Sequence, residues 1–230
     1  MTGVSHSINR RSYEFKERLK ALFRSEGLCD LYSNHEKEKG VYVFSGIIRD
    51  FLLNIDDEVR DIDIVFTKQY NTDGIKEYGE TLKREKNSFG GTKLSINGLN
   101  LDVWQLKKTW GIVAARRYPT RKALYESSFF NCSAILYDLR EERFYYDVQF
   151  RDFLDKKVLD IVYPNNPDEP LCIVNAFYYK EKYNVLFSKR LSDWIREKGE
   201  TIADFEQVQR RHYGKVLYSN QCIADQIRMI

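Results

Sequence analysis

The chain has 230 residues, enough for one large domain or for a domain with a small appendage. Its 37 Lys and Arg against 34 Asp and Glu leave a net charge of +3, which excludes a protein that coats nucleic acid by charge alone. The content of 43% apolar and 14% aromatic residues excludes a disordered chain, and no apolar run approaches the roughly 20 residues that span a bilayer. We therefore expect a soluble globular protein without a membrane partner.

The cysteines and histidines indicate whether to expect a zinc site and which cellular compartment to expect. The cysteines at positions 29, 132, 172 and 222 are widely separated, and none has a histidine nearby, which argues against a zinc site. The first residues contain no apolar segment of the kind that directs secretion. We therefore expect free thiols and a cytoplasmic location.

Helical and strand patterns alternate in the first part of the chain. The apolar spacing predicts a helix over about 12–26 and a strand at 41–45 that leads into a helix at 47–53. Strand-like alternation follows at 61–66, 93–96 and 99–106, with Asn97-Gly98 as the turn between the last two. Residues 132–137 fit either a helix or a strand, and 143–148 fit a strand.

A proline-rich segment separates this part from a helical one. Pro164, Pro167 and Pro170 fall close together in a stretch rich in Asn and Asp, which is typical of a loop. Helical patterns follow at 171–182, 188–198, 202–212 and 218–229. We therefore predict an α+β protein with a head domain over 1–162 and a small helical, neck-like unit over 163–230.

Asp61 and Asp63 are the first candidates for chemistry. Two carboxylates at positions i and i+2 of a strand project from one face, while Ile62 and Ile64 point to the core. Oxygen ligands of this kind suit Mg²⁺, which also binds substrate phosphates. A polar face at the edge of a sheet is the alternative explanation for such a pair.

The preceding segment favours the metal interpretation. Residues 43–50 read as a strand, a tight turn at Ser45 and Gly46, and the start of a helix. Small residues allow close approach of the backbone, and a helix N-terminus attracts anions. A phosphate-binding turn and a metal-binding pair on consecutive elements suit phosphoryl transfer.

Asp102 is the candidate third carboxylate. It interrupts an apolar alternation on a strand that can pair with residues 61–66, and a two-metal site needs such a ligand. A solvated polar face remains the alternative for Asp102 taken alone. Trp104 and Trp110 flank it, and either core packing or a nucleotide pocket would account for them.

These motifs carry a resemblance to a known family. The run SGIIRDFLLN followed by RDIDIVF resembles the head of the DNA-polymerase-β-type nucleotidyltransferases, in particular the class II tRNA CCA-adding enzymes and the bacterial poly(A) polymerases. Their pattern is a small-residue turn, then xxRDxLL, then DxD. Weaker similarities follow in the same order at 89–92, 101–103, 132–138 and 168–171, so that the resemblance covers about residues 40–195.

The resemblance implies a mixed β-sheet flanked by helices and an Mg²⁺-dependent nucleotidyltransferase. Such an enzyme transfers a nucleoside monophosphate from an NTP, ATP among them, to a hydroxyl and releases pyrophosphate. The acceptor would be an RNA 3′ end, as in tRNA processing, a protein side chain or a small molecule. Asp61 and Asp63 would hold two metals (Mn²⁺ is the alternative ion), Asp102 would complete the site, and Ser45 and Gly46 would contact the phosphates.

The sequence also departs from the family. The arginines of the family's neck helix fall on Cys172, Asn175 and Tyr178, and its RRD segment reads Ser127-Ser128-Phe129. Because those family residues bind the nucleotide and select its base, base selection is expected to be altered. The family also continues into an RNA-binding body, so we do not expect full CCA addition. The alternative is a non-catalytic nucleotide-sensing or partner-binding module on the same fold.

Three groups of cations could replace the missing arginines. Arg116 and Arg117 begin a basic stretch, expected as a loop, that extends to residue 122 and would attract a triphosphate or RNA, although a solvated loop explains it equally. Lys93 is a weaker candidate. Arg49 would either contact substrate phosphate or pair with a neighbouring acid.

Overall fold

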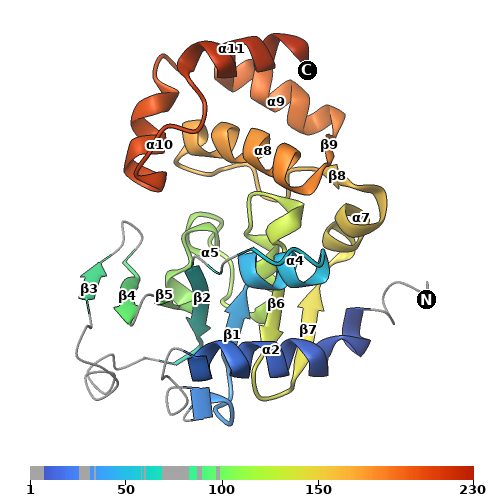
Figure 1. The fold of residues 1–230 in the computed structure, drawn as a ribbon, viewed down its shortest axis with the longest axis vertical. Helices are drawn as coiled ribbons and strands as arrows, with labels where there is room; N and C mark the ends of the chain where they lie inside the picture. Colours follow the sequence, from blue (N-terminus) through green and yellow to red (C-terminus); the bar gives the residue numbers. More distant parts are fainter. Residues whose placement is uncertain are drawn as a thin grey trace.

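Seven strands form a mixed sheet in the order β3-β4-β5-β2-β1-β6-β7 (Figure 1). The structure is a computed structural model that describes residues 8–25, 32–33, 35–57, 59, 61–68, 83–86, 90–96 and 99–230. The strands are β1 (Val41–Phe44), β2 (Asp61–Phe66), β3 (Lys83–Lys86), β4 (Thr92–Ile96), β5 (Leu99–Gln105), β6 (Ile135–Asp138) and β7 (Arg143–Tyr146). Only β2 and β5 run parallel among these neighbouring pairs, and the others are antiparallel. The expected turn at Asn97-Gly98 lies outside the described residues.

One face of the sheet packs against two helices from the first part of the chain. These are α2 (Ser12–Ser25) and α4 (Gly46–Leu52), which cross in front of β1, β6 and β7 in Figure 1. Phe15 of α2 is fully buried, and its ring lies 4.9 Å from that of Tyr137 and 5.3 Å from that of Phe144. Ile62 and Ile64 contribute to this core, as the alternation predicted. The helix expected at about 12–26 is thus confirmed, and its apolar face covers the sheet.

The opposite face is covered by two short helices that the sequence pattern did not predict. They are α5 (Trp110–Ala114) and α6 (Arg121–Glu126), and the 3₁₀ turn η2 (Leu106–Lys108) precedes them. Val65 of β2 packs on this side with Ile112 and Leu124. The basic stretch expected as a loop therefore ends in a helix, whose N-cap Thr120 accepts a hydrogen bond from the Ala123 backbone N–H.

The rest of the chain is mainly helical and lies beyond one end of the sheet (Figure 1). It comprises η3 (Asn131–Ser133) near β6, then α7 (Val148–Lys156), β8 (Val158–Leu159), α8 (Glu169–Tyr183), β9 (Leu186–Phe187), α9 (Lys189–Gly199), α10 (Phe205–Tyr213) and α11 (Asn220–Met229). Asp168 caps α8 by accepting from the Leu171 N–H, and Pro170 fits its first turn, where no N–H is needed. The predicted change from the mixed part to helices is confirmed, and the boundary at residue 162 stays a prediction.

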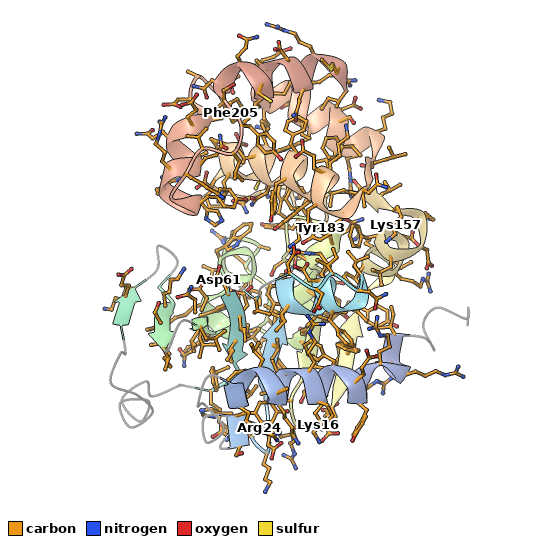
Figure 2. The ribbon with its side chains drawn as sticks, in the orientation of Figure 1. Lys16, Arg24, Asp61, Lys157, Tyr183 and Phe205 are labelled. Atoms are coloured by element: carbon orange, nitrogen blue, oxygen red, sulfur yellow. The ribbon has the colours of Figure 1, made fainter. Side chains whose placement is uncertain are left out.

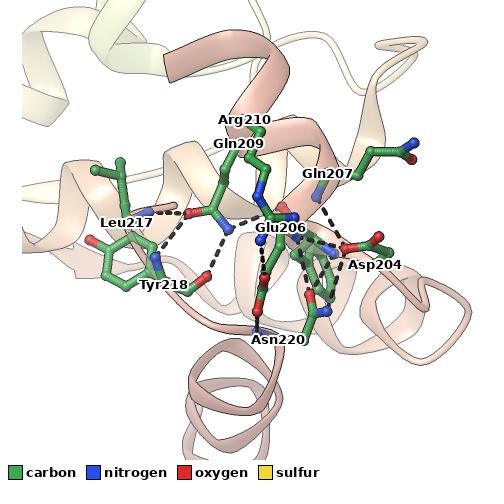
Figure 3. A network of polar contacts seen from close by, with 9 residues as sticks. Asp204, Glu206, Gln207, Gln209, Arg210, Leu217, Tyr218 and Asn220 are labelled. Carbon is green, nitrogen blue, oxygen red and sulfur yellow. Dashed lines mark hydrogen bonds and ion pairs between the residues drawn. The ribbon is translucent and has the colours of Figure 1, made fainter. Parts of the chain in front are cut away.

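A buried glutamine joins the last two helices (Figure 3). Gln209 is fully buried, and its Nε2 donates to the carbonyls of Phe205 and Tyr218. Its Oε1 accepts from the backbone N–H groups of Leu217 and Tyr218. Since every polar atom of this side chain is bonded, its burial costs little and fixes the α10–α11 connection.

The arrangement confirms the expected α+β class, with a mixed sheet, helices on both faces and a helical C-terminal part. Within the described residues, no helix is both long and apolar enough to cross a bilayer.

Candidate active site

The carboxylates meet where the two parallel strands lie side by side. In the register of β2 and β5, Asp63 pairs with Asp102 and Asp61 pairs with Asn100. Neighbouring strands are about 4.8 Å apart, and residues opposite one another in a ladder share a face. Asp63 and Asp102 therefore project together, and Asp61 lies on the same face two residues earlier. Asp61 is at the end of β2 that points toward the C-terminal helices (Figure 2).

A cavity of about 330 Å³ opens beside these carboxylates, between the sheet and α8. Its volume falls in the range of small-molecule sites. It is lined by side chains from both parts of the chain: Phe44, Ser45, Asp63, Gly91, Asp102, Trp104, Lys108, Thr109, Trp110, Ser127, Ser128, Phe129, Phe130, Ser133, Asn166, Cys172, Asn175 and Tyr179. Of the residues proposed from the sequence, the structure brings Ser45, Asp63 and Asp102 to this wall.

The turn between β1 and α4 has an unusual backbone. Ser45 has φ 55° and ψ −103°, a region that favours glycine, and its N–H donates to the Ile135 carbonyl. Gly46 begins α4 but is not among the cavity-lining residues. A strained serine in the cavity wall is consistent with a functional turn.

This strain gives a stability prediction. Replacing Ser45 with glycine is expected to stabilise the fold by about 1 kcal/mol, since relief of about 1–3 kcal/mol of strain exceeds the greater chain entropy of glycine. Urea unfolding of both proteins measures the difference. The matched control is Ser192→Gly inside α9, which should lose about 0.5–1 kcal/mol. A loss of stability at both positions would contradict the prediction.

Arg49 is buried at the junction of the sheet part and α8. Its Nε donates to the hydroxyl of Tyr183 at 2.7 Å and to Asp50 Oδ1 at 3.2 Å, and its Nη1 donates to Ser133 Oγ at 3.3 Å. Its guanidinium also lies 4.7 Å from the ring centroid of Tyr179. Of the two roles that the sequence left open for Arg49, its described contacts match the pairing with a neighbouring acid. Arg49 does not line the cavity, but it contacts Ser133 and Tyr179, which do.

Asp50 completes this junction. Its carboxylate accepts from Lys182 at 2.9 Å and from the Tyr183 hydroxyl at 2.8 Å, besides Arg49. Burial opposes ionisation, but Arg49, Lys182 and Tyr183 together hold the pKa of Asp50 below its ordinary value. The same carboxylate thus links α4 to the end of α8.

A pH dependence follows from the lowered pKa. A carboxyl group with a depressed folded-state pKa stabilises the fold above its unfolded pKa of about 4, and this contribution is lost as the pH falls through the folded value. The difference in unfolding free energy between the wild type and Asp50→Asn should therefore be largest near neutral pH and shrink below about pH 4. Urea titrations across this range measure it, and a pH-independent difference would contradict it.

The basic stretch after the Asp102 strand lies outside the cavity lining. Arg116 and Arg117 are exposed. Arg117 pairs with Glu126 at 3.3 Å and lies 5.9 Å from the ring of Tyr163, which in turn is 5.8 Å from the cavity-lining Trp110. These arginines are therefore near one rim of the cavity and not in its wall.

Two lysines are closer to the carboxylates. Lys108 lines the cavity, and among the described lining residues it is the one cation. Lys93 of β4 forms an ion pair with Asp61, with 3.5 Å between Nζ and Oδ1. Sequence reasoning missed Lys108, because a lysine in a turn after a strand has no local pattern that separates it from solvated lysines.

The positions at which the sequence departs from the family that its motifs resemble carry neutral side chains in this cavity. Cys172 and Asn175, at two of the positions where that family has arginines, line it, as does Tyr179 next to the third, Tyr178. Asn175 Oδ1 accepts a hydrogen bond from Tyr213, which fixes its amide. Ser127, Ser128 and Phe129, where the family has RRD, also line the wall. The structure therefore brings five of the six substituted positions into the wall of one cavity, and Tyr178 is the exception.

The donor set suits a hard divalent cation, because carboxylate oxygens are the ligands that Mg²⁺ prefers. In the part of the chain that the structure describes, no three Asp, Glu, His or Cys side chains converge as a metal site as they stand. Asp63 and Asp102 face the cavity, while Asp61 is engaged by Lys93. A metal bound by all three would therefore meet the ammonium group of Lys93 at Asp61.

No family profile and no curated protein matches the sequence. Solved structures of other proteins do resemble the structure of this chain. Similar solved structures include a CCA-adding enzyme in complex with CTP (TM-score 0.63, 20% identity) and the Thermotoga maritima CCA-adding enzyme in complex with tRNA (TM-score 0.60, 20% identity). Each comparison covers 92% of this chain, and 51% and 50% of the respective enzyme. A CCA-adding enzyme in complex with ATP matches 84% of this chain and 45% of its own, at 22% identity and a TM-score of 0.55.

This chain spans about half the length of those enzymes. At these identities the likeness concerns the fold, and in the first two structures it covers 92% of this chain. The resemblance predicted from the sequence motifs is confirmed at this level: the protein has the nucleotidyltransferase-type fold of the CCA-adding enzymes.

Proposed function

We propose that this protein is a nucleotidyltransferase that uses a divalent cation, Mg²⁺ or Mn²⁺, to transfer a nucleoside monophosphate from an NTP to a hydroxyl acceptor. The observation that carries the proposal is the register of β2 and β5, which sets Asp63 beside Asp102 in the wall of a cavity of about 330 Å³. Carboxylates on one face repel each other, and a bound cation offsets that repulsion. The strained Ser45 turn in the same wall supports the assignment.

Each residue has a defined role in this proposal. Asp61, Asp63 and Asp102 would hold the metal ions, which stabilise the charge on the entering and leaving oxygens when bound. Asp102 would also orient the acceptor hydroxyl and take its proton as the oxygen attacks the α-phosphate and pyrophosphate leaves. Ser45 and Gly46 would approach the terminal phosphates through their backbone, with Lys108 as a cation in the wall.

The nucleotide base would lie against the neutral part of the cavity wall that Cys172, Asn175 and Tyr179 form. There Tyr179 offers a ring, and Asn175, whose oxygen is bonded to Tyr213, keeps an NH₂ donor. An amide in place of a guanidinium provides fewer donors and no charge, so base selection should be weaker than with arginines. CTP and ATP, the nucleotides named for the similar structures, are the first to test. Exposed Arg116 and Arg117 near the rim would meet an RNA acceptor, tRNA among the candidates.

The proposal is tested by incubating the purified chain with Mg²⁺ or Mn²⁺, each labelled NTP, and either total RNA or tRNA. Transfer of label with release of pyrophosphate is the expected result. No transfer to any acceptor, with either metal, would contradict it. We keep the cytoplasm as the proposed compartment, in line with the free thiols of Cys132 and Cys172.

A second candidate is a nucleotide-sensing or partner-binding module that no longer turns over. The observation that favours it is the replacement of the family's arginines by Cys172, Asn175 and Tyr178 in α8. Saturable binding of an NTP without any label transfer would select this alternative.

A further inference from the structure

Lys93 lies on the carboxylate face, at one end of a row of side chains that crosses three strands. In the register of β4 and β5 it pairs with Asp102, which in turn pairs with Asp63 across β5 and β2. The three side chains therefore form a row across three adjacent strands, since directly opposed residues share a face. Lys93 is the basic member of a row that is otherwise acidic.

The side chain of Lys93 reaches out of this row to Asp61, two residues before Asp63 on β2. Its Nζ lies 3.5 Å from Asp61 Oδ1, and Asp61 is on β2, one strand beyond Asp102. The lysine is thus placed over the face that carries all three carboxylates. Its side chain is 40% exposed and that of Asp61 is 18% exposed, so the carboxylate is partly withdrawn from solvent while the lysine is free to move outward.

A divalent cation and an ammonium group cannot share Asp61 without mutual repulsion. Two like charges about 4 Å apart interact unfavourably even in high dielectric, and more so at a partly buried site. A metal ion that uses Asp61 therefore competes with Lys93 for this carboxylate. We propose that Lys93 is a positioning residue that neutralises and holds Asp61 in the metal-free protein and that leaves it when a divalent cation binds, so that Lys93 sets the metal affinity.

This inference rests on the proposed metal site, and metal binding without nucleotide or acceptor tests it. Free Mn²⁺ is measured by electron paramagnetic resonance during titration of the full chain. Lys93→Met, which keeps most of the side-chain volume without the charge, is expected to bind Mn²⁺ about tenfold more tightly than the wild type. This factor corresponds to about 1.4 kcal/mol, slightly more than an exposed ion pair contributes. Lys93→Arg, which keeps the charge, should bind close to the wild type.

Two controls separate competition for Asp61 from a general change of charge. Lys189→Met removes one positive charge from α9, where Lys189 is 89% exposed and pairs with Asp193, and it should leave Mn²⁺ affinity unchanged. In an Asp61→Asn background, the effect of Lys93→Met should largely vanish, because the lysine and the metal then no longer compete for the Asp61 carboxylate. Circular dichroism verifies that each variant is folded, and Lys93→Gln replaces the methionine variant if that one is not.

The possible failures are distinguishable. If the wild type binds Mn²⁺ and Lys93→Met binds it equally, the role of Lys93 is overturned while the metal site stands. The same holds if the effect of Lys93→Met persists in full in the Asp61→Asn background. If neither the wild type nor Lys93→Met binds Mn²⁺, the proposed metal site is wrong and this inference falls with it.

Discussion

Asp63→Asn is expected to lower nucleotidyl transfer by about 10³-fold or more with little change in stability. Asp63 is opposite Asp102 in the parallel register and lines the cavity, so its carboxylate is central to the proposed metal site. A metal ion contributes several kcal/mol to the stabilisation of transition-state charge, and about 4 kcal/mol corresponds to that factor. The amide has nearly the same shape, so the strand should remain intact. Single-turnover transfer of labelled nucleotide measures the effect.

The matched control is Asp152→Asn. Asp152 is on α7, pairs with Lys156 at 2.9 Å and has a side chain that is 40% exposed. The substitution removes one negative charge, as Asp63→Asn does, but at a position outside the cavity. An exposed ion pair of this kind contributes little to stability. Its transfer rate should be close to that of the wild type. Equal rates for Asp63→Asn and Asp152→Asn would show that the chemistry occurs elsewhere.

Arg49→Met is expected to destabilise the protein by about 3–5 kcal/mol, the cost of breaking a buried charge pair by removing one partner. The side chain of Arg49 is 7% exposed, and it bridges α4, Ser133 and two tyrosines of α8. Its removal leaves Asp50 with Lys182 and Tyr183 and withdraws a cation from the rings of Tyr179 and Tyr183. Urea unfolding measures the loss.

Two further variants show whether the loss of stability in Arg49→Met comes from the charge, from the planar guanidinium group or from the removal of any arginine. Arg49→Lys keeps the charge but not the planar stacking or the fork of donors, so it should recover only part of the stability. Arg228→Met, at an exposed arginine on α11 that pairs with Asp225, should change stability by less than about 1 kcal/mol. If Arg49→Met unfolded at the same urea concentration as Arg228→Met, Arg49 would not hold the two parts together. Because Tyr179 lines the cavity, a nucleotide-binding assay of a folded Arg49 variant would also show whether the junction positions that ring.

The sequence by itself determined features that depend on local periodicity. Alternation over residues 61–66 showed that Asp61 and Asp63 share one face and that Ile62 and Ile64 face the core, because side chains on a strand alternate with a period of two. The helical pattern likewise predicted α8 over residues 171–182, but the structure begins this helix at Glu169, so Pro170, which was expected in the preceding loop, lies in its first turn. The motifs also led to the fold that the comparisons confirm.

Only the tertiary structure decided which distant residues meet. The parallel pairing of β2 with β5 brings Asp102 to Asp63, and the antiparallel pairing of β4 with β5 brings Lys93 to the same row. Strand partners and register are set by contacts between segments far apart in the chain, so no local pattern specifies them. The short helices α5 and α6 escaped prediction for a related reason: helices of 5 and 6 residues owe their stability to packing on the sheet and carry too little periodicity of their own. For the same reason, sequence left two roles open for Arg49, and only its burial against Asp50, Tyr179 and Tyr183 showed that it joins the two parts of the chain.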